Sequence, residues 1–229
     1  MSSSNEYTVN VPGEAPLIPQ GFSLAGYMIM AGDWVRSFEF DACELTLACE
    51  KWVQFGHKQD HLLCVCDSVG TGEDITTIYS EWDPAEHWMA WRNYYTDEQV
   101  AIKGDKKREV SCQQISINIP SEPPPAPKHF QLSQYQIVVG DNWGFPTFFR
   151  LTELLAASEQ WAVRGCESQK LMCVCKTARN RYIDEINGQR FIIYSIWQKD
   201  GAWGEWLDYH SDEPFDFDES ARWILLGLL

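Results

Sequence analysis

The chain of 229 residues is 45% hydrophobic and 14% aromatic, and its formal net charge is −15. This composition is typical of a globular protein, and the excess of acid argues against direct binding to nucleic acid, whose phosphates require Lys and Arg. No stretch has the roughly 18 apolar residues of a membrane span, and the start lacks the pattern of a signal peptide, so we expect a cytoplasmic protein that contacts no membrane.

Most of the sequence occurs twice, in two copies about 110 residues apart. Ten of the eleven tryptophans fall into five pairs, and Trp223 is left over. A period of this length indicates duplication of a whole domain rather than a solenoid repeat, so we predict two domains, 1–110 and 111–229. The matching segments are 9–12 and 117–120, and Tyr27 and Tyr135, at an offset of 108; 50–52 and 159–161, and 62–66 and 171–175, at 109; and 78–82 and 193–197, and 88–94 and 203–209, at 115.

In chain order, each half is expected to begin with a half-buried edge strand, at 8–11 and 116–119, and the residues before the first of these, 1–7, are expected to be disordered. Prolines follow at matching positions. They favour an extended polyproline II segment built into each half over a linker or a PxxP docking motif. A second strand is predicted at 27–30 and 136–139. The prolines are Pro12, Pro16 and Pro19 in the first half and Pro120, Pro124 and Pro127 in the second.

One helix per half is predicted after a Gly-Asp turn at 32–33 and 140–141. Apolar residues recur there at spacings of three and four, as on the buried face of a helix. Thr147 is the candidate N-cap in the second half, and Gly56 and Gly165 stand where glycine commonly ends a helix. The predicted face consists of Phe148, Leu151, Leu155, Ser158 and Ala162 in the second half and Phe40, Leu45, Ala48 and Trp52 in the first.

Three further strands are predicted in each half, so that about four to five mainly antiparallel strands pack against the single helix of an α+β domain. Turns at 187–188 and 200–201 join strands of the second half. The Trp-x-x-Trp-x-x-Tyr pattern of the last strand also fits a short helix, which stays an alternative. The apolar C-terminal tail, 223–229, requires burial. The strands are predicted at 61–67 and 170–176, at 76–82 and 190–197, and at 88–94 and 203–209.

No set of residues in the sequence indicates a reaction. Cys64 and Cys66, with counterparts at Cys173 and Cys175, alternate with apolar residues, and we assign them to the core rather than to a metal site. Ser80 lies inside an apolar strand, and none of the five histidines is matched in both halves, so a nucleophilic triad is not supported. We expect a protein without catalytic residues, metal or cofactor.

Acidic residues are the candidate partner-binding residues. The densest run lies at 205–219, which contains no Lys or Arg. The first hypothesis is a non-enzymatic inhibitor whose carboxylates imitate nucleic acid and occupy a basic surface of a partner protein, although such acidity can also serve solubility alone. The candidate residues are Glu205, Asp208, Asp212, Glu213, Asp216, Asp218 and Glu219, with Asp97 and Glu98 in the first half.

The paired aromatic residues allow a second hypothesis, a tandem module that binds glycan or peptide on an aromatic platform. Trp88, Trp91, Trp203 and Trp206 are the candidates, and packing explains them about equally well. The tryptophan pairs at 52 and 161 and at 82 and 197 are assigned to the core. A third hypothesis is an enzyme with a carboxylate or histidine site in one half. The chain is expected to be a monomeric pseudo-dimer or a homodimer.

Overall fold

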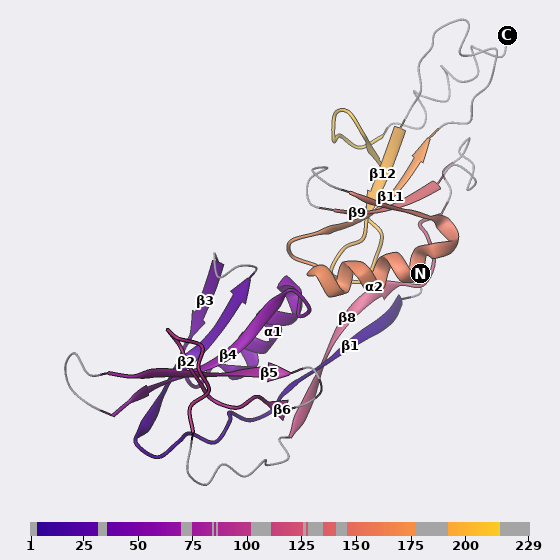
Figure 1. The fold of residues 1–229 in the computed structure, drawn as a ribbon. Helices are drawn as coiled ribbons and strands as arrows, with labels where there is room; N and C mark the ends of the chain where they lie inside the picture. The colour runs from indigo at the N-terminus through magenta and orange to yellow at the C-terminus, as the bar shows by residue number, and fades with distance from the viewer. Residues whose placement is uncertain are drawn as a thin grey trace, which may run out of the picture. The chain divides into compact units, whose positions relative to one another are not determined.

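The computed structural model describes residues 4–31, 36–69, 75–83, 85, 87–101, 111–125, 127, 135–140, 146–176 and 192–215. These residues form a mixed α+β protein of mainly antiparallel sheets and two α-helices (Figure 1). Neither of these helices has the length and apolar character needed to cross a membrane.

Two compact units divide the chain. One comprises Thr8–Ile117 and Ala162–Ser168, and the other comprises Met1–Tyr7, Asn118–Trp161 and Gln169–Leu229. The predicted boundary between residues 110 and 111 borders on 102–110, which lie outside the described residues, so it stays a prediction.

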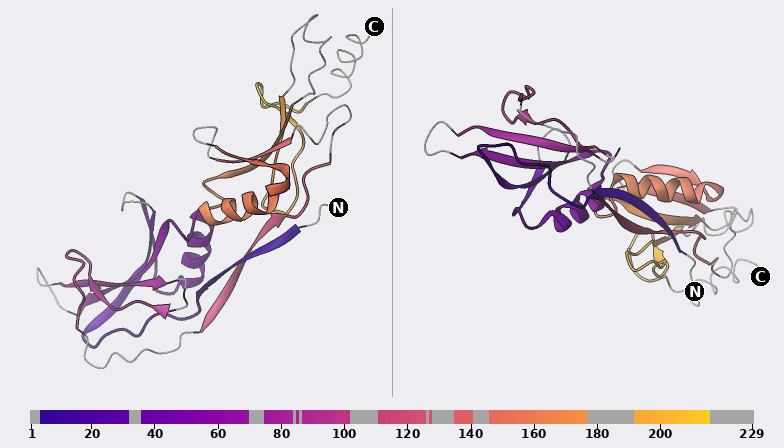
Figure 2. Two further views of the ribbon diagram at one scale, coloured as in Figure 1. Left: turned by 45° about the vertical axis from the view of Figure 1, so that its right-hand side comes forward. Right: turned by 90° about the horizontal axis from the view of Figure 1, so that it is seen from below.

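Strands β1 (Ser4–Pro12) and β8 (Cys112–Pro120) form a two-stranded sheet and run side by side in Figures 1 and 2. Because β1 begins at Ser4, the prediction of a disordered start was wrong for residues 4–7. The prolines that follow β1 have no regular secondary structure, and Pro16 and Pro19 are buried. Their burial favours a structural segment over an exposed docking motif, as expected.

The first sheet has the strand order β3-β2-β4-β5-β6, with antiparallel neighbours throughout. Helix α1 (Leu45–Phe55) contacts its first three strands. Gly56 follows α1 with a φ of 125°, and its N–H donates to Trp52 O (3.1 Å), as expected for a glycine stop. The strands are β2 (Phe22–Ala31), β3 (Arg36–Phe40), β4 (Asp60–Ser68), β5 (Thr77–Asp83) and β6 (His87–Trp88), with β7 (Arg92–Asn93) paired to β5.

The second sheet has the order β10-β9-β11-β12-β13 and is also antiparallel. A 3-10 turn (Leu151–Glu153) leads into α2 (Leu154–Arg164), which lies beside the sheet in Figure 1. Gly165 ends α2 with a φ of 100°. The strands are β9 (Tyr135–Gly140), β10 (Thr147–Arg150), β11 (Lys170–Lys176), β12 (Ile192–Ile196) and β13 (Leu207–Asp208).

Strands β3 and β10 lie where the apolar spacing predicts the start of each helix. Phe40 and Phe148 belong to these strands and not to a helix, and Phe148 is 60% exposed rather than buried. Thr147 begins β10 rather than capping α2, since β-branched and aromatic residues favour extended backbone. The carboxylates that accept a backbone N–H just before each helix are those of Glu44, from Asp41 (2.8 Å), and Glu153, from Arg150 (2.8 Å).

The last predicted strand of each half is shorter than expected. The stretch 88–94 contains the end of β6, the two-residue strand β7 and an isolated bridge at Arg92. The stretch 203–209 contains β13 and isolated bridges at Trp203 and Leu207. No helix forms in either described stretch. The short helix that the Trp-x-x-Trp-x-x-Tyr spacing allowed is therefore excluded there.

Each sheet is buried on two faces. In the first sheet, the paired neighbours Tyr27 and Cys64 lie on the inner face, since Tyr27 is close to Cys49 of α1. The opposite, outer face carries its own apolar cluster, which explains why β4 and β11 are nearly continuous apolar runs. These outer clusters consist of Met30, Leu63, Val65 and Tyr79 in the first sheet and of Val138, Met172, Val174 and Tyr194 in the second.

The same tryptophan contacts occur at matching positions of both halves. The indole N–H groups donate to main-chain oxygens, and two tryptophan pairs meet edge to face, with ring centroids 5.5 Å apart for Trp82 and Trp88 and 5.4 Å apart for Trp197 and Trp203. The hydrogen bonds run from Trp52 to Asp60 O (2.8 Å), Trp161 to Gln169 O (2.8 Å), Trp82 to Asn10 O (3.3 Å), Trp197 to Asn118 O (3.0 Å), Trp88 to Glu14 O (3.0 Å) and Trp203 to Glu122 O (2.8 Å).

The match between Tyr27 and Tyr135 was wrong in register. Tyr27 pairs with Cys64, whereas the counterpart of Cys64, which is Cys173, pairs with Ile137. Tyr27 therefore corresponds to Ile137, at an offset of 110 rather than 108. A slip of two residues leaves every side chain on the same face of the sheet, so the alternation of apolar and polar residues does not reveal the error in register.

Candidate functional site

Two cavities open on the outer face of the first sheet, and the segment 87–100 bounds both. Tyr94 of this segment packs on the outer cluster, with its ring edge to face with Tyr79 and the centroids 6.1 Å apart. A cavity of about 550 Å³ has Tyr94 and Tyr95 in its wall, and one of about 360 Å³ has Arg92 and Asp97. We name them the acidic cavity and the ion-pair cavity.

The acidic cavity combines carboxylates with aromatic rings. Tyr94 and Tyr95 stand edge to face with 5.5 Å between centroids and 85° between ring planes, so they form a corner, and Tyr95 is 78% exposed. The Asp67 carboxylate accepts the Thr77 hydroxyl (2.8 Å). Among the described residues that line the cavity, none is Lys, Arg or His. Its carboxylates are those of Glu39, Asp41, Glu44 and Asp67.

The ion-pair cavity holds two acidic side chains that already have basic partners. His61 Nδ1 lies against the Glu81 carboxylate, and this hydrogen bond raises the pKa of His61. Arg92 pairs with Asp97 (2.8 Å), and the hydrogen bonds from Tyr79 and from Arg92 lower the pKa of Asp97. Burial, with the hydrogen bond to Asp97, raises the pKa of Tyr79 to about 12, so its hydroxyl stays protonated at neutral pH.

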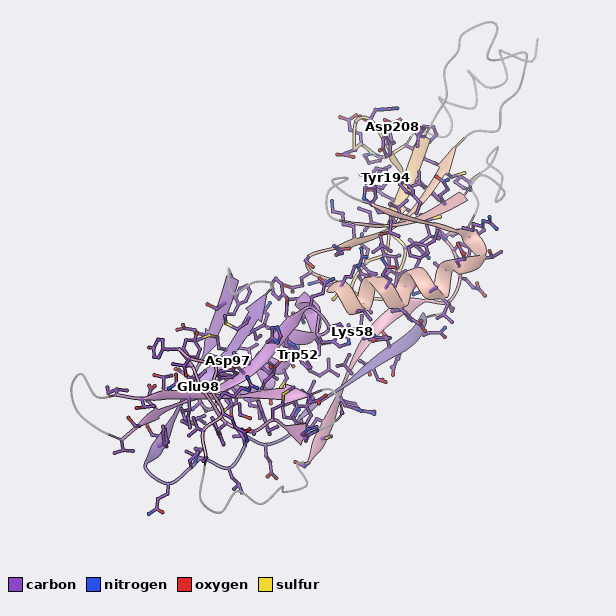
Figure 3. All side chains as sticks on the ribbon, viewed as in Figure 1. Trp52, Lys58, Asp97, Glu98, Tyr194 and Asp208 are labelled. Carbon is purple, nitrogen blue, oxygen red and sulfur yellow. The ribbon has the colours of Figure 1, made fainter. Side chains whose placement is uncertain are left out.

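The candidate acidic residues of the second half lie on a turn held by its own side chains. The Asp208 carboxylate accepts the N–H groups of His210 (2.9 Å) and Ser211 (3.0 Å). Partial burial opposes ionisation of Asp208, but these hydrogen bonds outweigh it and lower its pKa. Asp212, at a φ of 59°, accepts the hydroxyl of Tyr194 (2.7 Å). Tyr194 and Asp208 are labelled in Figure 3. Glu213 is exposed on the same turn.

The first half has a similar turn with less acid. Asn93 Oδ1 accepts the N–H groups of Tyr95 and Thr96, at 3.0 Å each. Asp97, at a φ of 58°, accepts the hydroxyl of Tyr79, and the adjacent Glu98 is exposed. Asp97 and Glu98 are labelled in Figure 3. The candidate residues Asp97, Glu98, Asp208, Asp212 and Glu213 thus lie on two turns, and Glu205 is exposed just before the second. Asp216, Asp218 and Glu219, and the tail 223–229, lie outside the described residues.

The tryptophans divide into core and partly exposed rings. Trp52, Trp161, Trp82 and Trp197 are at most 3% exposed, which confirms the expected core positions. Trp91 is also only 3% exposed, so its ring offers no open face to a ligand. The other three platform candidates, Trp88, Trp203 and Trp206, are half-buried, and their binding of a ligand stays a prediction.

The cysteine and serine candidates lie in the core. Cys64, Cys66, Cys173 and Cys175 are fully buried, and burial raises the pKa of the Cys173 and Cys175 thiols, the latter to about 12. The buried hydroxyls of Ser80 and Ser195 donate to the main-chain oxygens of Met89 and Gly204, at 2.7 Å each. Within the described part of the chain, no three His, Cys, Asp or Glu residues group as metal ligands do.

Comparison of the chain with protein families, with curated proteins and with solved structures finds no match. The geometry and charge of the site are therefore the basis of the function proposed below.

Proposed function

We propose that this protein is a non-enzymatic, acidic interaction protein, an inhibitor that occupies a basic surface of a partner protein such as a nucleic-acid-binding groove. The observation that supports it most is the acidic turn at 208–213. Hydrogen bonds to Asp208 and Asp212 hold this turn, and Glu205 and Glu213 are exposed beside them. Carboxylates on a preorganised turn lose little freedom when a partner binds, which favours affinity.

The turn of the second half is the better candidate for contact with the partner, because a basic side chain pairs with an acidic residue of the turn in the first half. In the first half Arg92 pairs with Asp97, at 2.8 Å. The matching position of Arg92 in the second half is Leu207, and the matching position of Ala90 is Glu205. A basic partner therefore meets more uncompensated negative charge at the second turn.

The proposal also covers the domain organisation, the cellular location and the oligomeric state of the protein. The recurring tryptophan hydrogen bonds and ring pairs support a tandem duplication of one α+β domain, each copy having one helix and a five- or six-stranded sheet. We propose a cytoplasmic protein that binds no nucleic acid directly and that is a monomeric pseudo-dimer or a homodimer.

The proposal is tested with immobilised protein and the heparin-binding fraction of a lysate from the source cell. A basic partner should be captured at low salt, should be released at high salt, and should be displaced by a duplex DNA oligonucleotide that competes for its basic surface. The variant E205Q/E213Q removes two exposed charges without removing a hydrogen bond that holds the turn. It should capture at least about tenfold less partner.

The matched control is E50Q/E159Q, which removes two exposed charges from the helices α1 and α2. It should capture as much as the wild type. Equal loss of capture in both variants would show that only the overall charge of the protein matters, not the position of the acidic residues. Capture that DNA does not displace, or no capture at all, would overturn the proposed function.

A further inference from the structure

We propose that the acidic cavity of the first sheet binds a cationic side chain of the partner, arginine in preference to lysine. This site rests on the proposed function, because it names the group that a basic partner would insert. It differs from the acidic turn of the second half, since it is a concave site on the sheet with aromatic walls.

The cavity has the size and chemistry of a cation site. Its volume of about 550 Å³ lies within the range of ligand pockets and exceeds what one side chain needs. Tyr94 and Tyr95 form a perpendicular corner on which a guanidinium plane can stack, and a cation is attracted to the face of an aromatic ring. Glu39 and Asp41 supply carboxylates to its open fork of N–H groups, a geometry that suits arginine better than lysine.

Two of the four carboxylates already accept hydrogen bonds, but from uncharged donors. Glu44 accepts the N–H of Asp41, and Asp67 accepts the Thr77 hydroxyl, both at 2.8 Å. Neither bond neutralises a charge. Because none of the described lining residues is basic, the negative charge of the cavity stays available to an incoming cation.

The second sheet supplies an internal comparison. The corner formed by Tyr94 and Tyr95 has a counterpart there in Tyr209 and His210, with 5.4 Å between ring centroids and 85° between ring planes. The acids are replaced at the matching strand positions: the pairing registers and the shared helix-start bonds align Glu39 with Phe148, Asp41 with Arg150, and Asp67 with Lys176. The fourth acid, Glu44, is kept as Glu153, since both accept a backbone N–H just before their helix. The two halves thus keep a similar corner and change its charge, which indicates that Glu39, Asp41 and Asp67 are not required by the fold.

The test is an amide NMR titration of the full chain with acetyl-arginine amide, with acetyl-lysine amide, and with acetyl-citrulline amide as the uncharged match. Arginine should shift the amide signals around Tyr94, Tyr95 and Glu39 at millimolar concentration, lysine should bind more weakly, and citrulline should not bind. E39Q/D41N should weaken arginine binding about tenfold, through loss of two nearby charges. Y95A should weaken it through loss of the corner.

Two further variants keep the result interpretable. E50Q/E159Q removes the same number of charges outside both proposed sites and should bind arginine as the wild type does. E39F/D41R introduces residues that the second sheet already has at these positions, so it should fold, as judged by its amide spectrum, and should not bind arginine. Equal weakening in E39Q/D41N and E50Q/E159Q, or shifts spread over all acidic residues, would overturn the cavity as the site. Failure here together with successful capture of a DNA-displaced partner would leave the proposed function standing without this contact.

Discussion

We predict that His57 makes the stability of the protein depend on pH in a range where surface carboxylates contribute little. After the turn at Gly56, the His57 ring packs edge to face on Trp52, with centroids 5.8 Å apart, and it is only 6% exposed. Burial, with a smaller contribution from Lys58, lowers the pKa of His57 from 6.5 to about 4 (Figure 3 labels Trp52 and Lys58). The unfolded chain therefore binds a proton more tightly than the folded protein does.

The sign and size of the effect follow from this difference. The contribution of neutral His57 is fully present above pH 6.5 and is lost as the pH falls toward 4. At pH 5 the full shift corresponds to about 2 kcal/mol, and solvent screening reduces the expected loss to about 1 kcal/mol. Replacement by a residue that does not titrate should remove this dependence.

The assay compares the free energy of unfolding at pH 7 and pH 5, by urea titration with tryptophan fluorescence, in the wild type, H57Q and H57F. The wild type should lose about 1 kcal/mol more than either variant between the two pH values. H57F retains a ring against Trp52 and controls for lost packing. A His57 Cε1 signal that titrates at or above pH 6.5, or variants with the pH dependence of the wild type, would refute this reasoning.

Three further predictions concern features that occur at equivalent positions of both halves. Y194F removes the hydroxyl that donates to Asp212 and should cost about 1 kcal/mol of unfolding free energy, measured in urea; a neutral result would show that the bond does not hold the turn. G56A places a side chain at a φ of 125° and should cost about 1 kcal/mol or more, seen as a lower thermal midpoint; an unchanged midpoint would contradict a required left-handed conformation. S80A and S195A should each cost about 1 kcal/mol, and unequal losses would show that the two buried hydroxyls are not equivalent.

Much of the fold could be predicted from local patterns of apolar residues, because the segments with the clearest patterns are also the most buried. The strand predicted at 170–176 has the observed bounds of β11, and the one at 61–67 falls within β4, since both strands are apolar on two faces. The pattern failed where a strand and a helix meet. Phe148 continues the helical spacing of α2, yet it lies in β10, and only the Glu153 carboxylate before the helix indicates the true start.

The candidate site was harder to predict. The cavity on the first sheet draws Glu39 and Asp67 from strands that are distant in sequence, and no periodicity relates them. A usable signal was present in the differences between the halves, because acid is replaced by Arg150 and Lys176 at matching positions. Charge changes between otherwise similar halves point to the cavity, whereas the residues that the halves share do not.

The register of β2 and β9 has a practical consequence for exchanging parts between the halves. A chimaera designed from sequence similarity would join these strands at an offset of 108, although their partners place them at 110. The grafted strand would bury the correct side chains but enter its flanking loops two residues out of step, about 7 Å along the sheet. Crossovers in β4 and β5, where sequence and pairing agree at 109 and 115, are the safer sites for recombination.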